Sequence, residues 1–404
     1  MKAKSIDTSR DAPTVGVHTK TRAGLNVLFL TPWYPTTDSP VAGVFVRECA
    51  RAVSLYHNVV VVHDAGIDPN QRRAWRLEQE TNGDLTAGIP TYRFWHRRSP
   101  VPKTSYILYL WSVWRACCRL ARQGFRPDII HAHVYGVGVP AVLAARLRRI
   151  PVVITEHFTG FPRRLLSRRE VRSARWAFRR ADVVMPVSES LLRAIEAYDI
   201  KANFRVVPNV ADTHIFHHRP HSLPNAGPKR LLCVALLDEK KGIRYLLEAV
   251  AKLPPQAGPW RLDIVGDGPE RQPLQAKAQE LGISDRVTFQ GVRPKSEVAE
   301  FMGAADLFVL PSLWENLPCV IAEAMTTGLP VLSTLVGGIP EMVDDMVGML
   351  VPPGDADALS AALASMLENL DRYDRAAIAW RANIYSPESV ANVLHSIYEE
   401  CLRK

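Results

Sequence analysis

Cysteine is scarce in this sequence, and its spacing argues against a disulfide framework or a zinc module. The six cysteines are Cys49, Cys117, Cys118, Cys233, Cys319 and Cys401, without a CxxC pair or a metal-ligand spacing. Isolated thiols of this kind are typical of a reducing compartment. We therefore expect a cytoplasmic protein whose thiols are free.

Long apolar runs are lacking as well. No uncharged apolar stretch reaches the roughly 18 residues that a membrane-spanning helix needs, so none is expected. The first twenty residues carry charges throughout and no apolar segment, so a secretory signal is not expected either. Residues 1–22 are predicted to be a disordered basic tail.

Nucleic-acid motifs are also missing, although the chain is basic. The net charge is +9, but residues 1–219 hold 33 Lys and Arg against 17 Asp and Glu, whereas the remainder holds 17 against 24. This asymmetry suggests different partners for the two halves. Without a recognised motif we expect no nucleic acid. An anionic membrane surface or a phosphate-bearing acceptor fits the basic half better.

Short β-branched runs alternate with amphipathic stretches along the whole chain, and five runs in each half are typical of buried parallel strands. The predicted strands are Asn26–Leu30, Val59–His63, Ile129–His133, Val152–Glu156 and Val183–Val187, then Arg230–Leu236, Arg261–Val265, Val287–Gln290, Leu307–Pro311 and Pro330–Ser333. The pattern predicts an α/β fold with two doubly wound Rossmann-like domains facing each other across a cleft.

The domain boundary is predicted in residues 217–229, which are rich in His, Pro and Asn and lack periodicity. The predicted organisation is an N-terminal Rossmann-like domain over 23–216, this linker, and a C-terminal Rossmann-like domain over 230–385. Residues 386–404 are predicted to form a helix that packs back on the first domain. Ligands of open α/β sheets sit at the carboxyl ends of the strands, so the interdomain cleft is the expected site.

The most informative segment runs from Leu310 to Met325 and has the pattern strand, tight loop, helix, with Pro318 suited to the first helical turn. Backbone amides near Asn316 and Leu317 would then point out of a helix N-terminus, a favourable place for phosphate. Glu315 precedes them and Glu323 lies well inside the helix. The two carboxylates therefore flank the phosphate-facing end, where each can accept hydrogen bonds from hydroxyl groups.

Glu315 and Glu323 form an E-x7-E pattern that resembles the retaining glycosyltransferases of family 4, the "group 1" transferases of GT-B fold. Three flanking sequence segments carry the same resemblance. They are Glu323-Ala-Met-Thr-Thr-Gly-Leu-Pro-Val, then Gly337-Gly-Ile-Pro-Glu341, and earlier Val265-Gly-Asp-Gly-Pro-Glu270. The resemblance covers about residues 25–365. It implies that the domain over 23–216 is the acceptor side and that the domain over 230–385 binds the nucleotide-sugar.

The resemblance implies roles for the donor side. Glu323 would hold the ribose hydroxyls, Glu315 would lie beside the donor sugar, and the amides of Asn316 and Leu317 would hold the diphosphate. Lys241 would place a positive charge on the leaving group. Relatives often carry an arginine where this chain has Leu236, so leaving-group stabilisation would depend more on Lys241.

Further donor-side positions follow from the same resemblance. Gly43 lies in the loop after the first strand, where a glycine allows close approach to the donor. Gly266 and Asp267 form a turn beside the nucleotide, and Val292 is expected to face the base. Asn209 is interpreted as structural support.

Two histidines of the first half complete the candidate site. His157 follows a strand and matches a family histidine near the donor sugar, which gives it a place among the catalytic candidates. His133 shares a strand face with His131 and is a candidate on the acceptor side. The resemblance implies that neither a metal ion nor another cofactor is needed.

The acceptor side is indicated by composition alone. Residues 162–180 contain eight arginines and one acid, and residues 106–125 interleave aromatic and basic side chains. Such stretches can lie on an anionic membrane, as a peripheral protein on its inner face would, or can be an ordinary solvated helix face.

The sequence is therefore interpreted as a retaining, metal-independent hexosyltransferase that moves a sugar from a nucleotide-sugar to a glycan or lipid-linked acceptor of the cell envelope. Two alternatives remain open at this point. One is a sugar-nucleotide epimerase of the same architecture, and the other is a non-catalytic scaffold of a polysaccharide-assembly complex.

Overall fold

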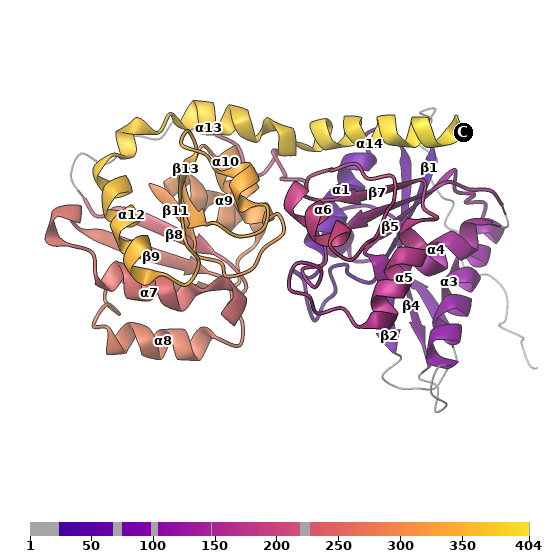
Figure 1. Cartoon of the computed structure of the whole chain (residues 1–404), viewed down its shortest axis with the longest axis horizontal. Helices are drawn as coiled ribbons and strands as arrows, with labels where there is room; N and C mark the ends of the chain where they lie inside the picture. The colour runs from indigo at the N-terminus through magenta and orange to yellow at the C-terminus, as the bar shows by residue number, and fades with distance from the viewer. Residues whose placement is uncertain (1–23, 68–74, 98–103, 147, 219–226, 404) are drawn as a thin grey trace, which may run out of the picture.

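The computed structural model describes residues 24–67, 75–97, 104–146, 148–218 and 227–403. The predicted tail over 1–22 and residues 219–226 of the predicted linker lie outside this part of the chain. Two α/β domains stand side by side, each with its own sheet (Figure 1). The prediction of two doubly wound domains is confirmed.

The N-terminal domain is built on a seven-stranded sheet in the order β3-β4-β2-β1-β5-β6-β7, parallel except for the edge strand β3. The strands are β1 (Asn26–Thr31), β2 (Asn58–Ile67), β3 (Trp75–Gln79), β4 (Thr91–His96), β5 (Ile129–His133), β6 (Val152–Glu156) and β7 (Val183–Pro186). The helices are α1 (Val44–Val53), α2 (Gly83–Thr86), α3 (Thr104–Arg122), α4 (Tyr135–Arg146), α5 (Arg168–Phe178) and α6 (Glu189–Glu196).

The C-terminal domain has a six-stranded parallel sheet in the order β10-β9-β8-β11-β12-β13. Its strands are β8 (Lys229–Val234), β9 (Trp260–Val265), β10 (Val287–Gly291), β11 (Leu307–Leu310), β12 (Val331–Thr334) and β13 (Gly348–Val351). Its helices are α7 (Ile243–Ala251), α8 (Arg271–Glu280), α9 (Lys295–Ala304), α10 (Cys319–Thr326), α11 (Ile339–Met342), α12 (Ala356–Glu368) and α13 (Arg375–Arg381), with short 3-10 turns that include η1 (Glu239–Lys241).

Alternation along the strands buries both faces of the N-terminal sheet. In β1, Val27 and Phe29 pack into one core with α1, whereas Leu28 and Leu30 pack into the other with α3, α4 and α5. Both faces of a parallel sheet must be covered, which is why its strands are apolar throughout.

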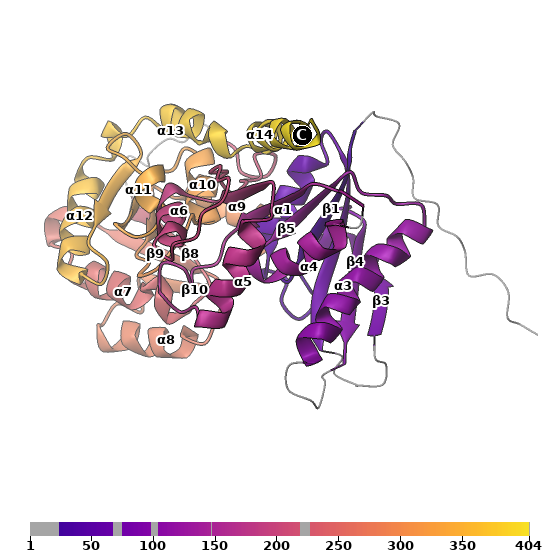
Figure 2. The same ribbon diagram turned by 45° about the vertical axis from the view of Figure 1, so that its right-hand side comes forward.

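The last helix, α14 (Pro387–Leu402), closes the first of these faces. It leaves the C-terminal domain and runs across to lie against α1 (Figures 1 and 2). Its buried Leu394, Ile397 and Tyr398 join the core of Val27 and Phe29. The Tyr398 hydroxyl is 2.7 Å from Nδ1 of His131 on β5. The chain end thereby ties the two domains together.

Each sheet has one topological switch point, where the order of strands reverses. It lies between β8 and β11 in the C-terminal domain and between β1 and β5 in the N-terminal domain. Open α/β sheets bind ligands in the crevice at the carboxyl ends of such strands. Lys241 follows β8, Glu315 follows β11, Gly43 follows β1 and His133 ends β5.

Candidate active site

The loop between β11 and α10 positions Glu315. Its Oε1 accepts hydrogen bonds from Lys241 Nζ at 2.5 Å and from Ser312 Oγ at 2.9 Å. A Cβ on Gly337, which has a φ of +54°, would lie 1.9 Å from the Glu315 carbonyl oxygen. Only glycine permits this approach. The loop that carries Glu315 therefore packs directly against the loop that follows β12.

Lys241 reaches Glu315 because the chain turns sharply after η1. Gly242 has a φ of +63°, and a Cβ there would lie 2.2 Å from the carbonyl oxygen of Pro311. Burial disfavours the ammonium, but the Glu315 carboxylate more than offsets this and raises the pKa of Lys241. The residue is therefore a fixed positive charge at the carboxyl ends of β8 and β11.

The helix α10 begins beside this pair. Within the described residues, the backbone N–H groups of Asn316 and Leu317 donate to no other protein atom. The Asn316 side chain reaches the other domain, where its Nδ2 donates to the His157 carbonyl at 2.6 Å. Asn209 donates in the same way to the Leu317 carbonyl at 2.7 Å. The loop therefore contacts the N-terminal domain while its amides stay available.

Glu323 lies further along α10 and is buried. Burial raises its pKa, an effect that Lys295 opposes and that Glu48 reinforces. The Lys295 ammonium is 3.7 Å from the Glu323 carboxylate and 3.1 Å from that of Glu48 on α1. Lys295 thus lies between one acid from each domain, at the start of α9.

Glu48 belongs to a larger ion cluster in the N-terminal domain. Its carboxylate also pairs with Arg47 at 2.8 Å and Arg51 at 3.0 Å, and Arg51 pairs in turn with Asp212. Burial alone would raise the pKa of Glu48, yet Lys295 and Arg47 hold it below its usual value. The sequence motifs did not point to Lys295 or Glu48, because the two residues lie far apart in the chain.

Gly43 caps α1 after the β1 loop. Its φ is +64°, and a Cβ would lie 2.3 Å from the carbonyl carbon of Trp33, so the turn requires glycine. The next aromatic residue, Phe45, places its ring 4.5 Å from the ring of His157. Gly43 therefore shapes the wall against which His157 packs.

His157 and His133 form a stacked pair with ring centroids 5.4 Å apart, and His133 Nδ1 lies 3.2 Å from His157 Nε2. Burial lowers the pKa of His157 to about 3, although an Asn209 hydrogen bond opposes this, so the ring is neutral at physiological pH. His133 is fully buried. The structure thus places His133 against the ring of His157, and its role on the acceptor side stays a prediction.

The remaining predicted donor-side residues surround the ends of β9 and β10. A Cβ on Gly266 would lie 1.8 Å from the Ala235 carbonyl oxygen. The Asp267 carboxylate stabilises its own turn, since it accepts a hydrogen bond from the Gly268 amide at 2.7 Å and pairs with Arg271 at 2.8 Å. Val292 is exposed beyond β10. Leu236 is also exposed, and its apolar side chain offers no charge to a phosphate.

Two further contacts cross between the domains and were not predicted. The Glu341 carboxylate accepts the backbone amides of Glu189 and Ser190, at 2.9 Å and 2.8 Å, at the N-terminus of α6. The Arg163 guanidinium lies 5.8 Å from the ring of exposed Trp314. Both join the C-terminal domain to the loops of the N-terminal one.

One group in the described part of the chain has side chains that could hold a metal ion: Cys49, His131 and His133. Both ring nitrogens of His131 are engaged, one with the Tyr398 hydroxyl at 2.7 Å and one with the Thr155 hydroxyl at 2.6 Å. A ligand needs a free lone pair on nitrogen. His131 therefore serves the packing of α14 on the sheet.

Facing doubly wound domains whose switch points meet across an interface, with a lysine and two glutamates on one side, define the GT-B architecture of glycosyltransferases. Residues 214–381 match the family model of group 1 glycosyl transferases, and residues 42–215 match that of glycosyltransferase family 4. The chain belongs to the group 1 glycosyltransferases.

Individual relatives agree with this assignment. The chain is 34% identical over 280 residues to the putative colanic acid biosynthesis glycosyltransferase WcaL of Escherichia coli K12, covering 66% of this chain and 68% of that protein. HepE of Anabaena, solved with UDP, superposes with a TM-score of 0.72 at 22% identity, over 93% of this chain and all of that one. Sucrose-phosphate synthase of Thermosynechococcus elongatus superposes with a TM-score of 0.72 at 21% identity, over 93% and 98%.

Proposed function

We propose that this glycosyltransferase moves a sugar, with retention of anomeric configuration, from a nucleotide-sugar donor to a glycan or lipid-linked acceptor of the cell envelope. The contact between Lys241 and Glu315, beside the free amides of Asn316 and Leu317 ahead of α10, carries the proposal. The solved complex of HepE with UDP supports the donor class, and the similarity to WcaL supports an envelope acceptor.

The donor diphosphate would lie at the N-terminus of α10. There it accepts hydrogen bonds from the amides of Asn316 and Leu317, and Lys241 neutralises the charge that grows on the leaving group. Glu315 then exchanges its lysine contact for the hydroxyls of the donor sugar. The departing diphosphate takes the proton of the acceptor hydroxyl, so the enzyme's groups position and stabilise rather than attack.

Glu323 would receive the two ribose hydroxyls. Its carboxylate lies 3.7 Å from the Lys295 ammonium, which also pairs with Glu48 of the other domain. Ribose binding adds donors to a buried carboxylate and thereby favours its ionised form.

The reaction is proposed to need no metal ion, because the positive charge for the diphosphate is supplied by Lys241 and by helix amides. Turnover measured with excess chelator should equal turnover in its absence. A loss of activity that divalent ions restore would overturn this part of the proposal.

A screen of donors tests the proposed function most directly. UDP-, GDP- and ADP-sugars are added to the protein and its melting temperature is measured, since a ligand that binds only the folded state raises it. One nucleotide class should stabilise the wild type and fail to stabilise Glu323→Ala. A new nucleotide-sugar formed from that donor without any acceptor would identify an epimerase instead.

The acceptor would be reached at a membrane surface. The helices α3 and α5 lie on one face of the N-terminal sheet, with α4 between them (Figure 1). Tyr106, Ile107 and Trp114 of α3 are exposed. Arg168, Arg169 and Arg172 of α5 are exposed too, whereas Arg175 donates to the Tyr198 carbonyl at 2.8 Å and belongs to the fold.

Vesicle sedimentation tests this docking. Each basic residue near an anionic surface contributes about 1 kcal/mol, so vesicles with phosphatidylglycerol should bind the protein at low salt and release it as salt rises. Replacing Arg168, Arg169 and Arg172 by Ser should weaken sedimentation, and replacing Arg244, Arg286 and Arg293 of the C-terminal domain should not. Wild-type protein that ignores anionic vesicles at low salt would refute docking. Of the described helices, none is long and apolar enough to cross a bilayer.

A further inference from the structure

A hollow of about 620 Å³ lies at the edge of the N-terminal domain that faces away from the candidate active site. It is bounded by the C-terminal end of α3, by the segment that leads into β5, and by the turn between α4 and β6. The lining side chains are Cys118, Ala121, Arg122, Arg126, Pro127, Arg148 and Ile150. Pro127 and Ile150 precede the amino ends of β5 and β6, whereas the candidate site lies at their carboxyl ends.

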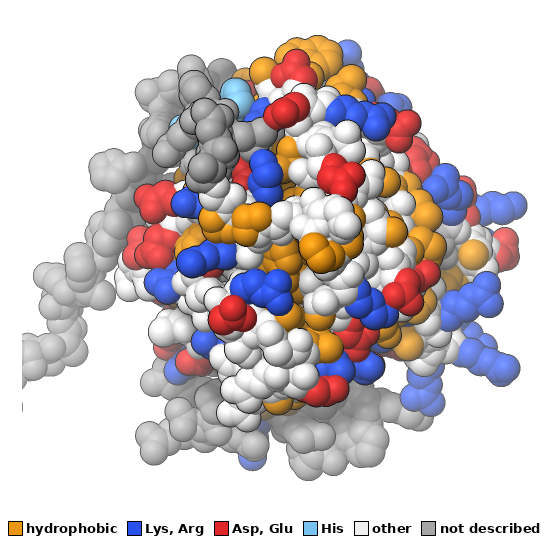
Figure 3. Space-filling view, turned by 90° about the vertical axis from the view of Figure 1, so that its left-hand side faces the viewer, with side chains coloured by type: hydrophobic (Ala, Val, Ile, Leu, Met, Phe, Trp, Pro, Cys, Tyr) orange, Lys and Arg blue, Asp and Glu red, His pale blue; other side chains and the backbone are white. Residues whose placement is uncertain are grey.

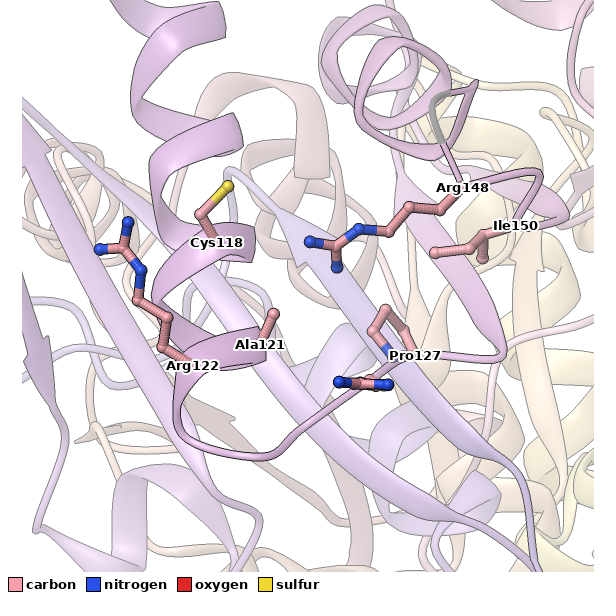
Figure 4. A pocket seen from close by; sticks show the side chains of 7 residues that line it. Cys118, Ala121, Arg122, Pro127, Arg148 and Ile150 are labelled. Atoms are coloured by element: carbon pink, nitrogen blue, oxygen red, sulfur yellow. The ribbon is translucent and has the colours of Figure 1, made fainter.

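Three of the seven lining residues are arginines. Figure 4 shows the Arg148 side chain extended toward Cys118 of α3, with Arg122 on the same helix. Within the described residues, no ion pair joins the guanidinium groups of Arg122, Arg126 or Arg148 to a carboxylate. Like charges around one hollow repel each other, and an anion placed among them removes the repulsion.

The nearby acids along this edge are already used by the backbone. Asp128 accepts the Asn26 amide at 2.7 Å, and Asp182 accepts the Val152 amide at 2.8 Å. Each carboxylate holds the first residue of a strand in place, Asp128 that of β1 and Asp182 that of β6. Within the described residues, these contacts are with backbone amides and not with the three arginines.

The floor between the arginines is largely apolar, formed by Cys118, Ala121, Pro127 and Ile150. Ligand sites usually have volumes of roughly 300–1,000 Å³, with an apolar lining and a few converging polar groups. Guanidinium groups are suited to phosphate oxygens, which they bind in pairs of parallel hydrogen bonds.

We propose that this hollow is a second anion site, separate from the donor site, which binds the phosphate group of a small phosphate ester. Arg126 and Arg148 hold the phosphate, Arg122 lies at the rim, and the rest of the ligand covers the apolar floor. The phosphate could come from a soluble metabolite or from the head group of a lipid. The site is independent of the proposed function, because none of its residues belongs to the cleft.

The half-buried thiol of Cys118 provides a local reporter. Its rate of alkylation by iodoacetamide is measured by peptide mass spectrometry, with inorganic phosphate, glycerol 3-phosphate, or dihexanoyl phosphatidic acid below its micelle concentration. Ligands that occupy the hollow should slow the labelling of Cys118 in a saturable manner. Cys319, half-buried at the start of α10, reports on phosphate in the cleft in the same sample.

Variants locate the effect. Arg126→Gln and Arg148→Gln should each raise the ligand concentration for half-protection of Cys118 about tenfold or more, because each loses a charged hydrogen-bonding partner. Arg149→Gln changes an exposed neighbour outside the hollow and should leave that concentration unchanged. All three positions are exposed, so each variant should keep the wild-type melting temperature.

The two phosphate sources are told apart by which compound protects at the lower concentration. Protection by glycerol 3-phosphate equal to that by the short-chain lipid assigns a soluble ligand, and a clear preference for the lipid assigns a head group. If no phosphate compound protects Cys118 more than sodium chloride at equal ionic strength, the proposal is wrong. The proposal would also be overturned if phosphate compounds protected Cys118 in Arg126→Gln and Arg148→Gln at the same concentration as in the wild type.

Discussion

The two domains share an architecture but differ in what their side chains do. The groups proposed to hold the donor, Lys241, Glu315, Glu323 and the α10 amides, all belong to the C-terminal domain. The N-terminal half carries the excess of positive charge, while acidic and basic side chains are interspersed on the outer end of the C-terminal domain (Figure 3). The proposed donor site thus lies in the C-terminal domain, and the excess positive charge lies in the N-terminal half.

The distribution of histidine also differs between the two domains. Residues 230–385 contain none of the chain's twelve histidines. The N-terminal sheet buries several, and α14 brings His395 to within 3.2 Å of His57. Neutral imidazoles can fill a core and still satisfy hydrogen bonds, but they gain protons within the physiological range once they are exposed. The two domains should therefore respond differently to acid.

The largest expected difference is in stability at low pH. Burial lowers the pKa of His57 to about 4 and those of His63, His131 and His157 to about 3. The unfolded chain takes up protons on these residues below about pH 6.5, before the folded protein does, so stability falls from there toward pH 4. Each pKa unit corresponds to about 1.4 kcal/mol, which gives a loss of several kcal/mol. Glu156, whose pKa burial raises to about 7, acts in the opposite direction and offsets part of it.

Hydrogen exchange at pH 7 and pH 5, followed by peptide, checks this prediction. Peptides from β1, β2, β5 and α14 should lose protection before those from β8, β9 and β11. His57→Gln removes one of the four groups and should make the loss of stability shallower. A C-terminal domain that opens first would contradict the assignment of acid sensitivity to the buried histidines.

The next largest effect is expected at Lys241. Its ammonium is proposed to bind the leaving diphosphate more tightly in the transition state, so Lys241→Met should lower kcat by about a hundredfold to a thousandfold, with a smaller effect on donor affinity. Lys240→Met is the matched control, since the Lys240 side chain pairs with Asp238 at 3.0 Å, whereas that of Lys241 contacts Glu315. Adding Leu236→Arg to Lys241→Met should restore part of the rate. An unchanged kcat in Lys241→Met would remove this residue from the mechanism.

What could be predicted from the sequence also differs between the domains. In the C-terminal domain Glu315, the amides of Asn316 and Leu317, and Glu323 lie in one continuous strand-loop-helix segment, so their spacing along the chain reports their spacing in space. β8 to β12 were predicted within a few residues. β13 was missed because it begins with a glycine and contains a single β-branched residue, Val351. In the N-terminal domain, β3 and β4 were missed because charged and aromatic residues interrupt their apolar pattern.

Contacts between the domains could not be read from either pattern. Lys295 with Glu48, Asn316 with the His157 carbonyl, and Glu341 with α6 join segments more than 150 residues apart or on different domains. The spacing of apolar residues within one helix or strand carries no information on contacts between residues so far apart in the sequence. The burial of His133 was likewise hidden, because alternation along β5 gives the face of a side chain but not what covers it.

Glu323 should give the third effect in size. Removal of a carboxylate that accepts both ribose hydroxyls costs about 1.5–3 kcal/mol, so Glu323→Ala should weaken nucleotide binding roughly tenfold to a hundredfold by calorimetry. Glu297→Ala on the exposed side of α9 is the control, since Glu297 only pairs with Arg293 at 3.2 Å. Equal nucleotide affinity in Glu323→Ala and the wild type would exclude the ribose role.

The smallest effect is expected where the two domains touch through Glu341. This carboxylate accepts two backbone amides at the N-terminus of α6, and an anion at a helix N-terminus typically contributes 0.3–1 kcal/mol. Glu341→Gln keeps the shape and one acceptor but removes the charge, so the closed arrangement should be destabilised about twofold to fivefold. Small-angle scattering should show a larger mean radius of gyration without donor and a radius near that of the wild type with saturating donor. The apparent KM for the donor should rise by a similar factor while kcat stays unchanged, because closure precedes chemistry and Glu341 touches no reacting atom. A fall in kcat with an unchanged radius of gyration would mean that Glu341 acts inside the cleft. Its contact with α6 would then not serve to hold the two domains together.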